Sequence, residues 1–598
     1  MTADRWWLAR LLFTGRQQII LAGLAMLGRA GVLVLVPWPL KYVVNCVILG
    51  RHPPHWMVSL SPAIASERIA LLNFLAVVML ALAAADAALD YCGNRLFLSA
   101  GQRTVYALRR QVFNHLLSLP IAYHRHRRGG ELMSRLTEDA GQIQDVIVVA
   151  GTSLFPHVLT LAGIVGVMLL IDWRYACLVI AILPMLGFIN YRWSHLLRAH
   201  LRRTRGREGE LWGLAQEVLA ALPLVQTSGR EPHEQRRFAL QGLSSLRAAL
   251  AATRTQAQLR PLIDVLIATG TTAVIWYGAM RALSGSLTPG DLLLFLAYLR
   301  GLVTPVRQIT KAAPQLGRCA VALERIREVF DERSPVCDPP HPVVPVRCLG
   351  RMEFRGVGFA YKPGVAALAD VAFTLAPGRR VALVGPTGAG KTTIAMLAIR
   401  MADPGSGQVL LDGEDLRRLP LRYVRRHVAL MLQDSPLLHG TVWENIAYGR
   451  PGARRADAIE AAIAAGVDDV IRALPDGYDT RVAERGGSLS GGQRQCIAIA
   501  RVTLADARVV ILDEPSSALD ATTERRIAGA LRRLGQDRAL LVIAHRLATI
   551  RDADEIIVLA HGRIAQVGSH HALLRNGGIY GSLLRDHGVE ALPQVAAE

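Results

Sequence analysis

The stretch of the chain from Val146 to Ile171 contains no Asp, Glu, Lys or Arg. A helix of about 20 apolar residues is long enough to cross the hydrocarbon core of a bilayer. A helix that is apolar on every side must be buried, either in a large protein core or in lipid. This stretch therefore predicts that the first half of the chain is embedded in a membrane.

Similar apolar segments surround this one, and together they predict six transmembrane helices near 18–48, 68–92, 147–171, 173–193, 261–283 and 288–312. Arginines crowd the two long connections, between spans two and three and between spans four and five, whereas the short loops on the other side carry few. Basic residues stay on the cytoplasmic side of membrane proteins. We therefore expect a multi-pass protein of the cell (inner) membrane with both termini in the cytoplasm.

The sequence outside the apolar spans predicts how the rest of the chain is organised. Both long connections of the first half have helix-like periodicity, so we expect them to extend the spans as rods into the cytoplasm. A proline-rich stretch, SPVCDPPHPVVPV, then favours neither helix nor sheet. From about residue 350, short β-branched strands alternate with helical patterns, as in an α/β domain. The expected domains are residues 1–333 in the membrane, a linker at 334–349, and an α/β domain at 350–598.

The formal charge of +20 first suggests a nucleic-acid partner. The positions of the arginines beside the apolar spans explain the charge without one, so we expect no nucleic acid. The seven cysteines contain no C-x-x-C pair and predict neither a disulfide framework nor a metal site.

A phosphate-binding loop follows the short apolar strand 381–384. Its glycines free backbone N–H groups to surround a phosphate, Lys391 can reach the β- and γ-phosphates, and the Thr392 hydroxyl can bind Mg²⁺. Only four of the 68 basic residues are lysines, which makes a lysine at this position more telling. The predicted nucleotide-binding residues of this loop are Gly385, Pro386, Thr387, Gly388, Ala389, Gly390, Lys391, Thr392 and Thr393.

Two carboxylates end a second apolar strand, at Asp513 and Glu514. Ligands of open α/β sheets bind at the carboxyl ends of the strands. We expect Asp513 to hold Mg²⁺ and Glu514 to act as the general base on the attacking water. The C-terminal half is thus predicted to be an α/β P-loop NTPase domain that binds ATP and Mg²⁺.

Between these motifs lies the pentapeptide Leu489-Ser-Gly-Gly-Gln493, followed by a helical segment. The combination resembles the ATP-binding cassette (ABC) superfamily, and the pentapeptide resembles its signature motif. The resemblance covers essentially the whole chain and is most specific in the soluble half. It implies a head-to-tail dimer in which Ser490, Gly491, Gly492 and Gln493 of one subunit complete the nucleotide site of the other.

The resemblance also implies roles for four single residues. Tyr361 resembles the aromatic residue that stacks on adenine, and Gln433 resembles the glutamine that contacts Mg²⁺ and water. Asp520 ends the segment that links the two sites of the dimer, and His545 resembles the histidine that contacts the γ-phosphate. Cys496 stands where family members often carry a basic residue, and no catalytic position is replaced.

The order of membrane domain and cassette resembles the exporter branch of the family. Residues 130–139 and 441–446 match it locally, and we expect 130–139 and a second helix near 216–226 to dock on the cassettes. The predicted function is ATP-driven export of a hydrophobic or amphipathic substrate, with a lipid or glycolipid flippase as one alternative. The partner is either a second copy or a different half-transporter. A cassette ATPase acting on nucleic acid and an ATP-gated channel are the other classes considered.

Charges within the predicted spans are the only sign of the cargo. A basic cavity for an anionic amphiphile such as a lipid is one interpretation. The other is internal pairing of arginine with aspartate. The residues concerned are Arg29, Asp86, Asp90, Asp264, Arg300 and Arg307.

Overall fold

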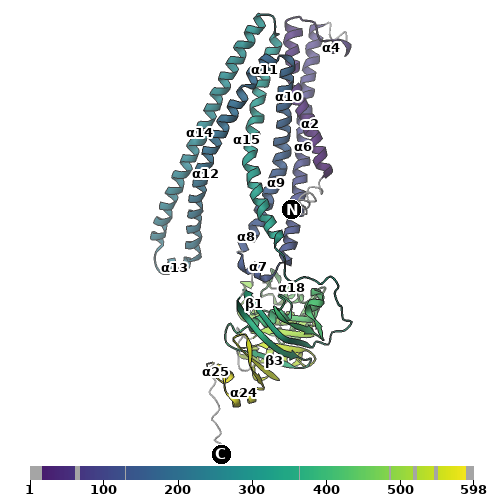
Figure 1. Ribbon diagram of the computed structural model, residues 1–598, viewed down its shortest axis with the longest axis vertical. Helices are drawn as coiled ribbons and strands as arrows, with labels where there is room; N and C mark the ends of the chain where they lie inside the picture. Colours follow the sequence, from purple (N-terminus) through teal and green to yellow (C-terminus); the bar gives the residue numbers. More distant parts are fainter. Residues whose placement is uncertain are drawn as a thin grey trace, which may run out of the picture. The chain divides into compact units, whose positions relative to one another are not determined.

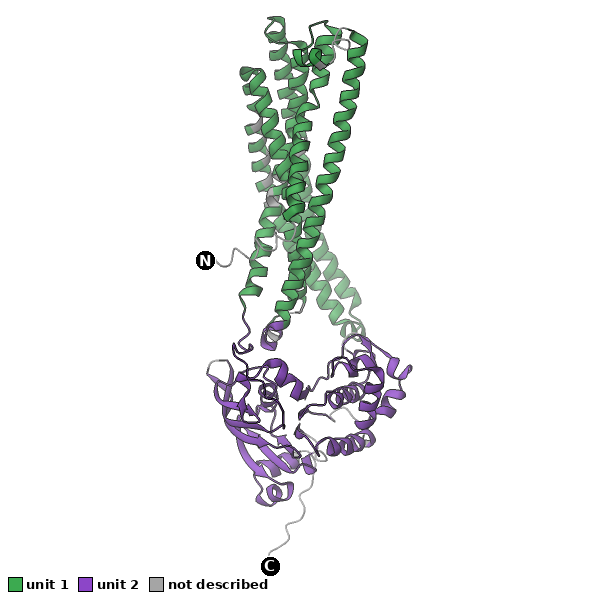
Figure 2. Ribbon diagram, turned by 90° about the vertical axis from the view of Figure 1, so that its right-hand side faces the viewer, with its two compact units in different colours: residues 1–117, 127–332 green, residues 118–126, 333–598 purple. Residues whose placement is uncertain are grey.

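The computed structural model describes residues 16–60, 67–127, 129–362, 364–483, 486–515, 521–544 and 550–586. Contacts within the chain divide it into two units (Figure 2). One comprises residues 1–117 and 127–332, and the other comprises residues 118–126 and 333–598. The short segment 118–126 therefore belongs with the C-terminal unit, although the chain on both sides of it is in the helical unit.

The described part of the first unit is helical (Figure 1). Its long helices are α2 (Arg16–Leu35), α6 (Arg68–Ser118), α10 (Phe155–Ile171), α12 (Ile182–Ala220), α14 (Glu231–Leu283) and α15 (Pro289–Asp331). Short helices and π-helical turns connect them, namely α3 (Trp38–Tyr42), η1 (Val43–Ile48), α4 (His55–Leu60), α8 (Gly129–Ser134), η2 (Arg135–Asp139), α9 (Ala140–Val149), η3 (Ala150–Leu154), α11 (Trp173–Ile180) and α13 (Leu222–Thr227).

Five helical stretches of the described chain are long and apolar enough to cross a membrane, and they coincide with predicted spans one, two, three, five and six. The remaining predicted span, 173–193, is also helical but is divided at Ala181 between α11 and α12. Pro184 lies in the first turn of α12, where the missing N–H of proline costs nothing. The division therefore lies where the sequence favours the start of a new helix.

Two helices are long enough to form the rods that the sequence predicts. Helices α6 and α14 have 51 and 53 residues, which corresponds to roughly 75–80 Å at 1.5 Å per residue. The hydrocarbon core is only about 30 Å thick, so each helix continues far beyond the membrane. Helices α12 and α14 lie side by side as a pair, whereas α10 packs against α2, α11 and α15 (Figure 1).

Aromatic side chains fill the core where these last helices meet. Tyr175, Phe295 and Tyr298 are almost completely buried. The hydroxyl of Tyr175 donates to the carbonyl of Val274 at 2.7 Å, and that of Tyr298 donates to the carbonyl of Val34 at 2.7 Å. Buried polar groups need such partners, and these bonds connect α11 to α14 and α15 to α2.

The docking of residues 130–139 on a cassette stays a prediction, and the structure shows how this segment packs within its own unit. Residues 130–139, which form α8 and η2, belong to the helical unit. Arg135 holds them against α15, because its Nη1 donates to the carbonyl of Arg325 at 2.9 Å and its Nη2 contacts Glu328 at 3.2 Å. The segment that groups with the cassette is 118–126, which contains α7 (Ile121–His126). The second expected segment, 216–226, covers the end of α12 and most of α13, and its docking remains a prediction.

The second unit contains two main sheets. An antiparallel sheet has the order β2-β1-β4-β5, with β1 (Met352–Lys362), β2 (Val365–Leu375), β4 (Ser406–Leu411) and β5 (Glu414–Asp415). A larger sheet has the order β12-β11-β3-β10-β9-β6 and is parallel except for β12, with β3 (Arg380–Val384), β6 (Val428–Met431), β9 (Val509–Asp513), β10 (Ala539–Ile543), β11 (Glu555–Ala560) and β12 (Arg563–Gly568). Strands β7 (Gly440–Thr441) and β8 (Arg481–Val482) form a small third sheet.

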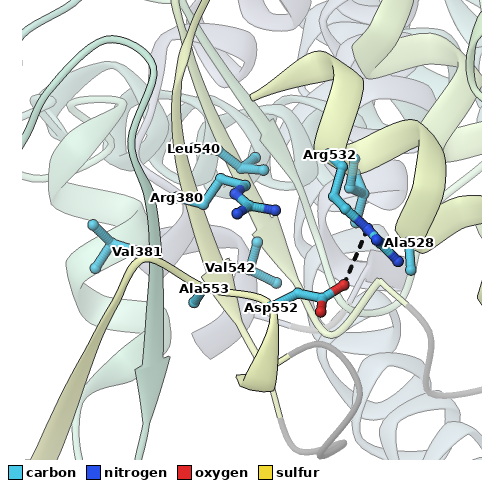
Figure 3. A pocket seen from close by; sticks show the side chains of 9 residues that line it. Arg380, Val381, Ala528, Arg532, Leu540, Val542, Asp552 and Ala553 are labelled. Atoms are coloured by element: carbon cyan, nitrogen blue, oxygen red, sulfur yellow. Dashed lines mark ion pairs between the residues drawn. The ribbon is translucent and has the colours of Figure 1, made fainter. Parts of the chain in front are cut away.

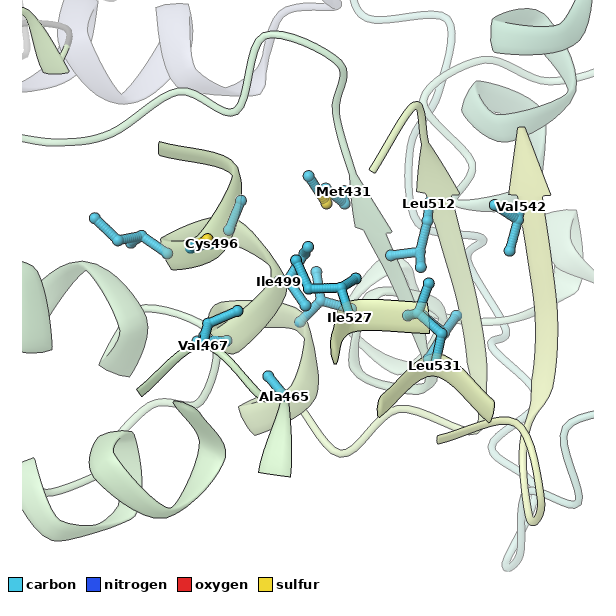
Figure 4. Close-up of a cluster of buried hydrophobic side chains, with 14 of the residues drawn as sticks. Met431, Ala465, Val467, Cys496, Ile499, Leu512, Ile527, Leu531 and Val542 are labelled. Carbon is cyan, nitrogen blue, oxygen red and sulfur yellow. The ribbon is translucent and has the colours of Figure 1, made fainter. Parts of the chain in front are cut away.

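Helices cover this larger sheet, and its strands alternate between two cores. Leu512 and Val542 point into one core with Ile499 and Ile527 (Figure 4), whereas Ile511 points into the other. Strands buried on both faces read as unbroken apolar runs, as β9 and β10 do. The helices of the unit are α16 (Lys391–Ala398), η4 (Leu416–Arg418), α17 (Leu421–His427), α18 (Val442–Ala447), α19 (Arg455–Ala464), α20 (Asp468–Arg472), η5 (Gly477–Asp479), α21 (Gly491–Leu504), α22 (Ala521–Leu534), α24 (His570–Asn576) and α25 (Ile579–Asp586).

The proline-rich linker has neither helix nor strand and lies along this unit. The buried guanidinium of Arg400 donates to the carbonyl of Cys337 at 3.1 Å, and the carboxylate of Asp338 accepts from the N–H of Leu421 at 2.6 Å. The linker is thus attached to the cassette by specific hydrogen bonds.

Candidate functional site

The phosphate-binding loop joins the end of β3 to the start of α16. Gly385, Gly388 and Gly390 all have positive φ, a region that other residues rarely adopt. A Cβ atom on Gly385 would lie 2.1 Å from the carbonyl oxygen of Leu559. The backbone thus requires glycine here, and Pro386, Thr387 and Ala389 complete the turn between the glycines.

Lys391 is the first residue of α16 and is 8% exposed. Its ammonium donates to the carbonyls of Gly385 at 2.7 Å and Pro386 at 3.0 Å, so the side chain folds back over its own loop. Burial lowers the pKa of Lys391, while the nearby charges of Glu514 and Asp513 oppose that shift. A buried cation that is held by carbonyl oxygens is suited to pairing with a phosphate.

Thr392 and Asp513 bring two distant motifs together. The Thr392 hydroxyl donates to Asp513 Oδ2 at 3.0 Å, and Asp513 is 2% exposed at the end of β9. Burial raises the pKa of the Asp513 carboxyl, an effect partly offset by the Thr392 hydrogen bond. A hydroxyl and a carboxylate are oxygen ligands of the type that Mg²⁺ prefers when phosphates supply further oxygens. These residues therefore fit an ion that arrives with a nucleotide.

Glu514 follows Asp513 and has a left-handed backbone, with φ of 52°. Its Oε2 accepts a hydrogen bond from Gln433 Nε2 at 2.9 Å. Gln433 follows β6, the strand next to β9 in the sheet. The parallel strands β3, β6 and β9 thus end together and bring Lys391, Thr392, Asp513, Glu514 and Gln433 to one edge of the sheet.

Tyr361 lies near the end of β1 and keeps its ring accessible. The residue is 56% exposed. Its hydroxyl is 3.1 Å from the hydroxyl of Thr393, and its ring meets Phe359 edge to face at 5.0 Å. The ring is therefore anchored next to α16, and more than half of the residue stays exposed.

The signature residues begin α21. Ser490 caps this helix, because its hydroxyl accepts from the N–H of Gln493 at 3.2 Å while its own N–H donates to Gln493 Oε1 at 2.9 Å. Gly491 and Gly492 occupy the first turn, where small residues leave backbone N–H groups accessible to an anion. Asp520 and His545 lie outside the described residues, so their positions remain predictions.

One polar residue near the site was missed by sequence reasoning. Gln495 is 4% exposed in α21, and its Nε2 donates to the backbone carbonyl of Glu514 at 3.3 Å. The sequence did contain a signal, because Gln495 is a polar residue directly before the apolar run CIAIA. A polar residue on the buried face of a helix requires a hydrogen-bond partner inside the domain.

A small hollow elsewhere in the cassette does not take part in this site. It lies between α22, β3 and β10, has a volume of about 30 Å³, and is bordered by the ion pair of Arg532 and Asp552 at 3.1 Å (Figure 3). Arg380 and Val381 line it at the start of β3, whereas the phosphate-binding loop follows the end of that strand. The hollow is far too small for a nucleotide.

Charges in the membrane-spanning helices are mostly paired. Arg29 contacts Asp86 at 3.1 Å and also pairs with Asp90, and Arg307 contacts Asp264 at 3.6 Å. The interpretation that arginines within the spans pair with aspartates therefore holds for Arg29 and Arg307. Arg300 is exposed, and within the described chain it has no ion pair or hydrogen bond.

Comparisons with known proteins agree with this architecture. Residues 19–306 match the family model of the ABC transporter transmembrane region, and residues 368–517 match that of the ABC transporter. The chain is 37% identical over 481 residues to an ATP-dependent lipid A-core flippase of Chromobacterium violaceum, covering 80% of this chain and 82% of the relative. It is 36% identical over 512 residues to a fatty acid ABC transporter ATP-binding/permease protein of Mycobacterium bovis, covering 85% and 80%.

A solved structure is similar over nearly the whole chain. It is a bacterial Atm1-family ABC exporter with ATP bound, which matches with a TM-score of 0.79 and 29% identity. The match covers 96% of this chain and 99% of that exporter.

Proposed function

We propose, for a chain that belongs to the ABC transporter family and acts as an ATP-hydrolysing membrane exporter, that two copies form the transporter and that the cargo is an anionic amphiphile of the lipid type. The membrane would be the cell (inner) membrane, with both termini on the cytoplasmic side. A different half-transporter as partner is the alternative to a second copy.

The convergence of Lys391, Thr392, Asp513, Glu514 and Gln433 at one sheet edge carries the proposal for ATP hydrolysis. Lys391 would bind the β- and γ-phosphates, and Tyr361 would stack on the adenine. Thr392, Asp513 and Gln433 would hold Mg²⁺, which supplies positive charge for the phosphate oxygens. Asp520 and His545 keep the roles that the family resemblance implies.

Glu514 would accept a proton from the attacking water. As the water oxygen bonds to the γ-phosphorus, the bond from that phosphorus to the bridging oxygen breaks, and ADP and phosphate leave. The hydrogen bond from Gln433 keeps the Glu514 carboxylate at the phosphate end of the site. General bases of this kind typically contribute 10²–10⁴-fold to the rate.

The dimer follows from the signature motif. Ser490, Gly491 and Gly492 form an accessible helix start, but in the described chain no hydrogen bond connects them to the phosphate-binding loop. A second copy would bring this helix start to the γ-phosphate, and two identical sites would result.

The position of Arg300 within a membrane span supports an anionic cargo. An unpaired arginine within a membrane span is costly unless it faces a polar cavity or a partner. The buried residues Phe295, Leu299 and Leu302 form the packed side of α15, and Arg300 lies outside it. The names of two relatives, a lipid A-core flippase and a fatty acid transporter, both refer to anionic amphiphiles.

The test uses the purified full chain in lipid nanodiscs. Glu514→Gln should lower kcat by about 100-fold or more, and hydrolysis at the parental rate would refute the assigned base. Oleate and lipid A should each be tested for stimulation of the ATPase, with a zwitterionic phosphatidylcholine for comparison. Arg300→Ala should reduce stimulation by the anionic lipids, whereas Arg318→Ala, an exposed arginine farther along the same helix, should not. If the anionic lipids stimulate the parent, Arg300→Ala and Arg318→Ala equally, the role of Arg300 is refuted.

A further inference from the structure

The buried side chain of Gln495 connects two parts of the site that sequence reasoning treated separately. It lies in the second turn of α21, a few residues after the signature motif. Its Nε2 donates to the carbonyl oxygen of Glu514 at 3.3 Å. The helix that begins with the signature residues is therefore hydrogen-bonded to the backbone of the proposed base.

The backbone of Glu514 needs such support. A residue other than glycine at φ of 52° pays on the order of 1 kcal/mol for that conformation. Its N–H donates to the carbonyl of Ile543 in β10 at 3.0 Å, and its carbonyl accepts from Gln495. One bond comes from the sheet and the other comes from α21. Together they fix the conformation that directs the Glu514 carboxylate toward Gln433.

Helix α21 is one continuous element from the signature residues to Gln495. The Ser490–Gln493 capping box closes its first turn. Cys496 and Ile499 are buried in the core that also contains Leu512 of β9 (Figure 4). A displacement at the capped end of the helix therefore reaches Gln495 without being absorbed by a flexible loop.

We propose that Gln495 is a positioning residue that couples the signature motif to Glu514 of the same chain. The inference rests on the proposed two-copy arrangement, in which the signature residues contact the nucleotide held by the other copy. Glu514 acts on the nucleotide of its own chain. ATP bound at one site thus orients the base at the other site, and hydrolysis at the two sites becomes cooperative.

Gln495→Met tests the coupling, because methionine has a similar length and no donor. The loss of one buried hydrogen bond to the base should lower kcat by about tenfold. The KM for ATP should stay within about twofold, and the Hill coefficient for ATP should fall toward 1. Thr503→Val is the matched control. It removes a side-chain hydrogen bond in the same helix, from Thr503 Oγ1 to the carbonyl of Ile499 at 2.9 Å, that does not reach Glu514.

Mixed dimers can be purified when each chain carries a different affinity tag. They distinguish a loss of positioning at Glu514 from damage to the signature motif. When Gln495→Met and Glu514→Gln are in the same chain, the intact Glu514 belongs to the other chain and keeps its own Gln495. This dimer should hydrolyse ATP as fast as a mixed dimer carrying Glu514→Gln alone. When the two substitutions are in opposite chains, the rate should fall by about a further tenfold.

The outcomes are distinct. Equal rates in the two mixed dimers, or an increase in KM without loss of kcat, would overturn the role of Gln495. A parental chain whose ATPase is insensitive to Glu514→Gln, or that does not form dimers, would instead refute the proposed function. If Gln495→Met does not fold, Gln495→Glu keeps the side-chain length and places an acceptor against the Glu514 carbonyl. The same kinetic pattern is then expected, and parental kinetics would overturn the proposal.

Discussion

The hydroxyl of Thr392 and the carboxylate of Asp513 are 3.0 Å apart, and the hydroxyl donates to the carboxylate. Thr392 lies in the first turn of α16 and Asp513 ends β9, so this bond connects the phosphate-binding loop to the acidic motif two strands away in the sheet. The same two groups are the proposed Mg²⁺ ligands. The site therefore keeps a buried carboxylate ready for a cation, at a cost to the stability of the nucleotide-free protein.

Asp513→Asn should raise the stability of the nucleotide-free protein and lower its ATPase activity. Because burial raises the pKa of Asp513 above its ordinary value of 3.8, the folded state binds the proton more tightly than the unfolded state. The stabilisation of the folded state by this bound proton is fully present below about pH 3.8. It is lost as the pH rises through the raised pKa. The nucleotide-free Asp513→Asn protein should therefore unfold at a higher temperature than the parent near pH 7.5, with a smaller difference near pH 4.5.

Thermal unfolding at the two pH values measures this difference, and ATPase assays should show a loss of roughly 100-fold or more. A variant that is less stable than the parent at neutral pH would contradict the argument. It would show that the hydrogen bond to Thr392 outweighs the cost of burying the charge.

Substitutions of Tyr361 distinguish its ring from its hydroxyl. Tyr361→Ala should raise the KM for ATP by about tenfold, because stacking on a base is worth ~1–3 kcal/mol, with little change in kcat. Tyr361→Phe keeps the ring and loses the hydroxyl contacts with Thr393 and Met396, so its KM should stay close to the parental value. A Phe variant as impaired as the Ala variant would assign the effect to the hydroxyl.

Arg29→Met should destabilise the helix bundle. The substitution leaves Asp86 and Asp90 without their cation, and removing one partner of a buried pair costs about 3–5 kcal/mol, less where the pair is partly exposed. The thermal midpoint should fall, and adding Asp86→Leu and Asp90→Leu should restore much of it. Arg300→Met is the matched control and should unfold like the parent, so a large loss there would show that Arg300 has a structural partner.

Arg135→Met should loosen the C-terminal end of α15. Arg135 is 4% exposed and holds Glu131, Glu328 and the carbonyl of Arg325. Without it Glu328 and the carbonyl of Arg325 lose this donor, while Glu131 keeps the one from Arg127. We therefore expect lower thermal stability and weaker stimulation of the ATPase by cargo, with basal hydrolysis retained. Arg110→Met, an exposed arginine on α6, is the control, and equal behaviour of the two variants would remove the special role of Arg135.

Much of this protein could be predicted from short stretches of sequence. The membrane helices follow from apolar runs, because lipid requires a helix of a certain length whatever lies beside it. The phosphate-binding loop, from Gly385 to Lys391, is also local, since its glycines, lysine and helix start are consecutive in the chain. The sequence indicated Asp513 and Glu514 as well, because an apolar strand that ends in acid places charge at a sheet edge.

Contacts between distant segments were decided only by the tertiary structure. Pairing of Arg29 with Asp86 was one of two open interpretations, and it depends on how α2 and α6 pack. The packing of η2 on α15 depends on Arg135, which contacts Arg325 and Glu328, 190 and 193 residues away in sequence. The bond from Gln495 to the Glu514 carbonyl depends on the place of α21 against β9. Side chains far apart in sequence meet only where packing brings their elements together, and no local pattern records that meeting.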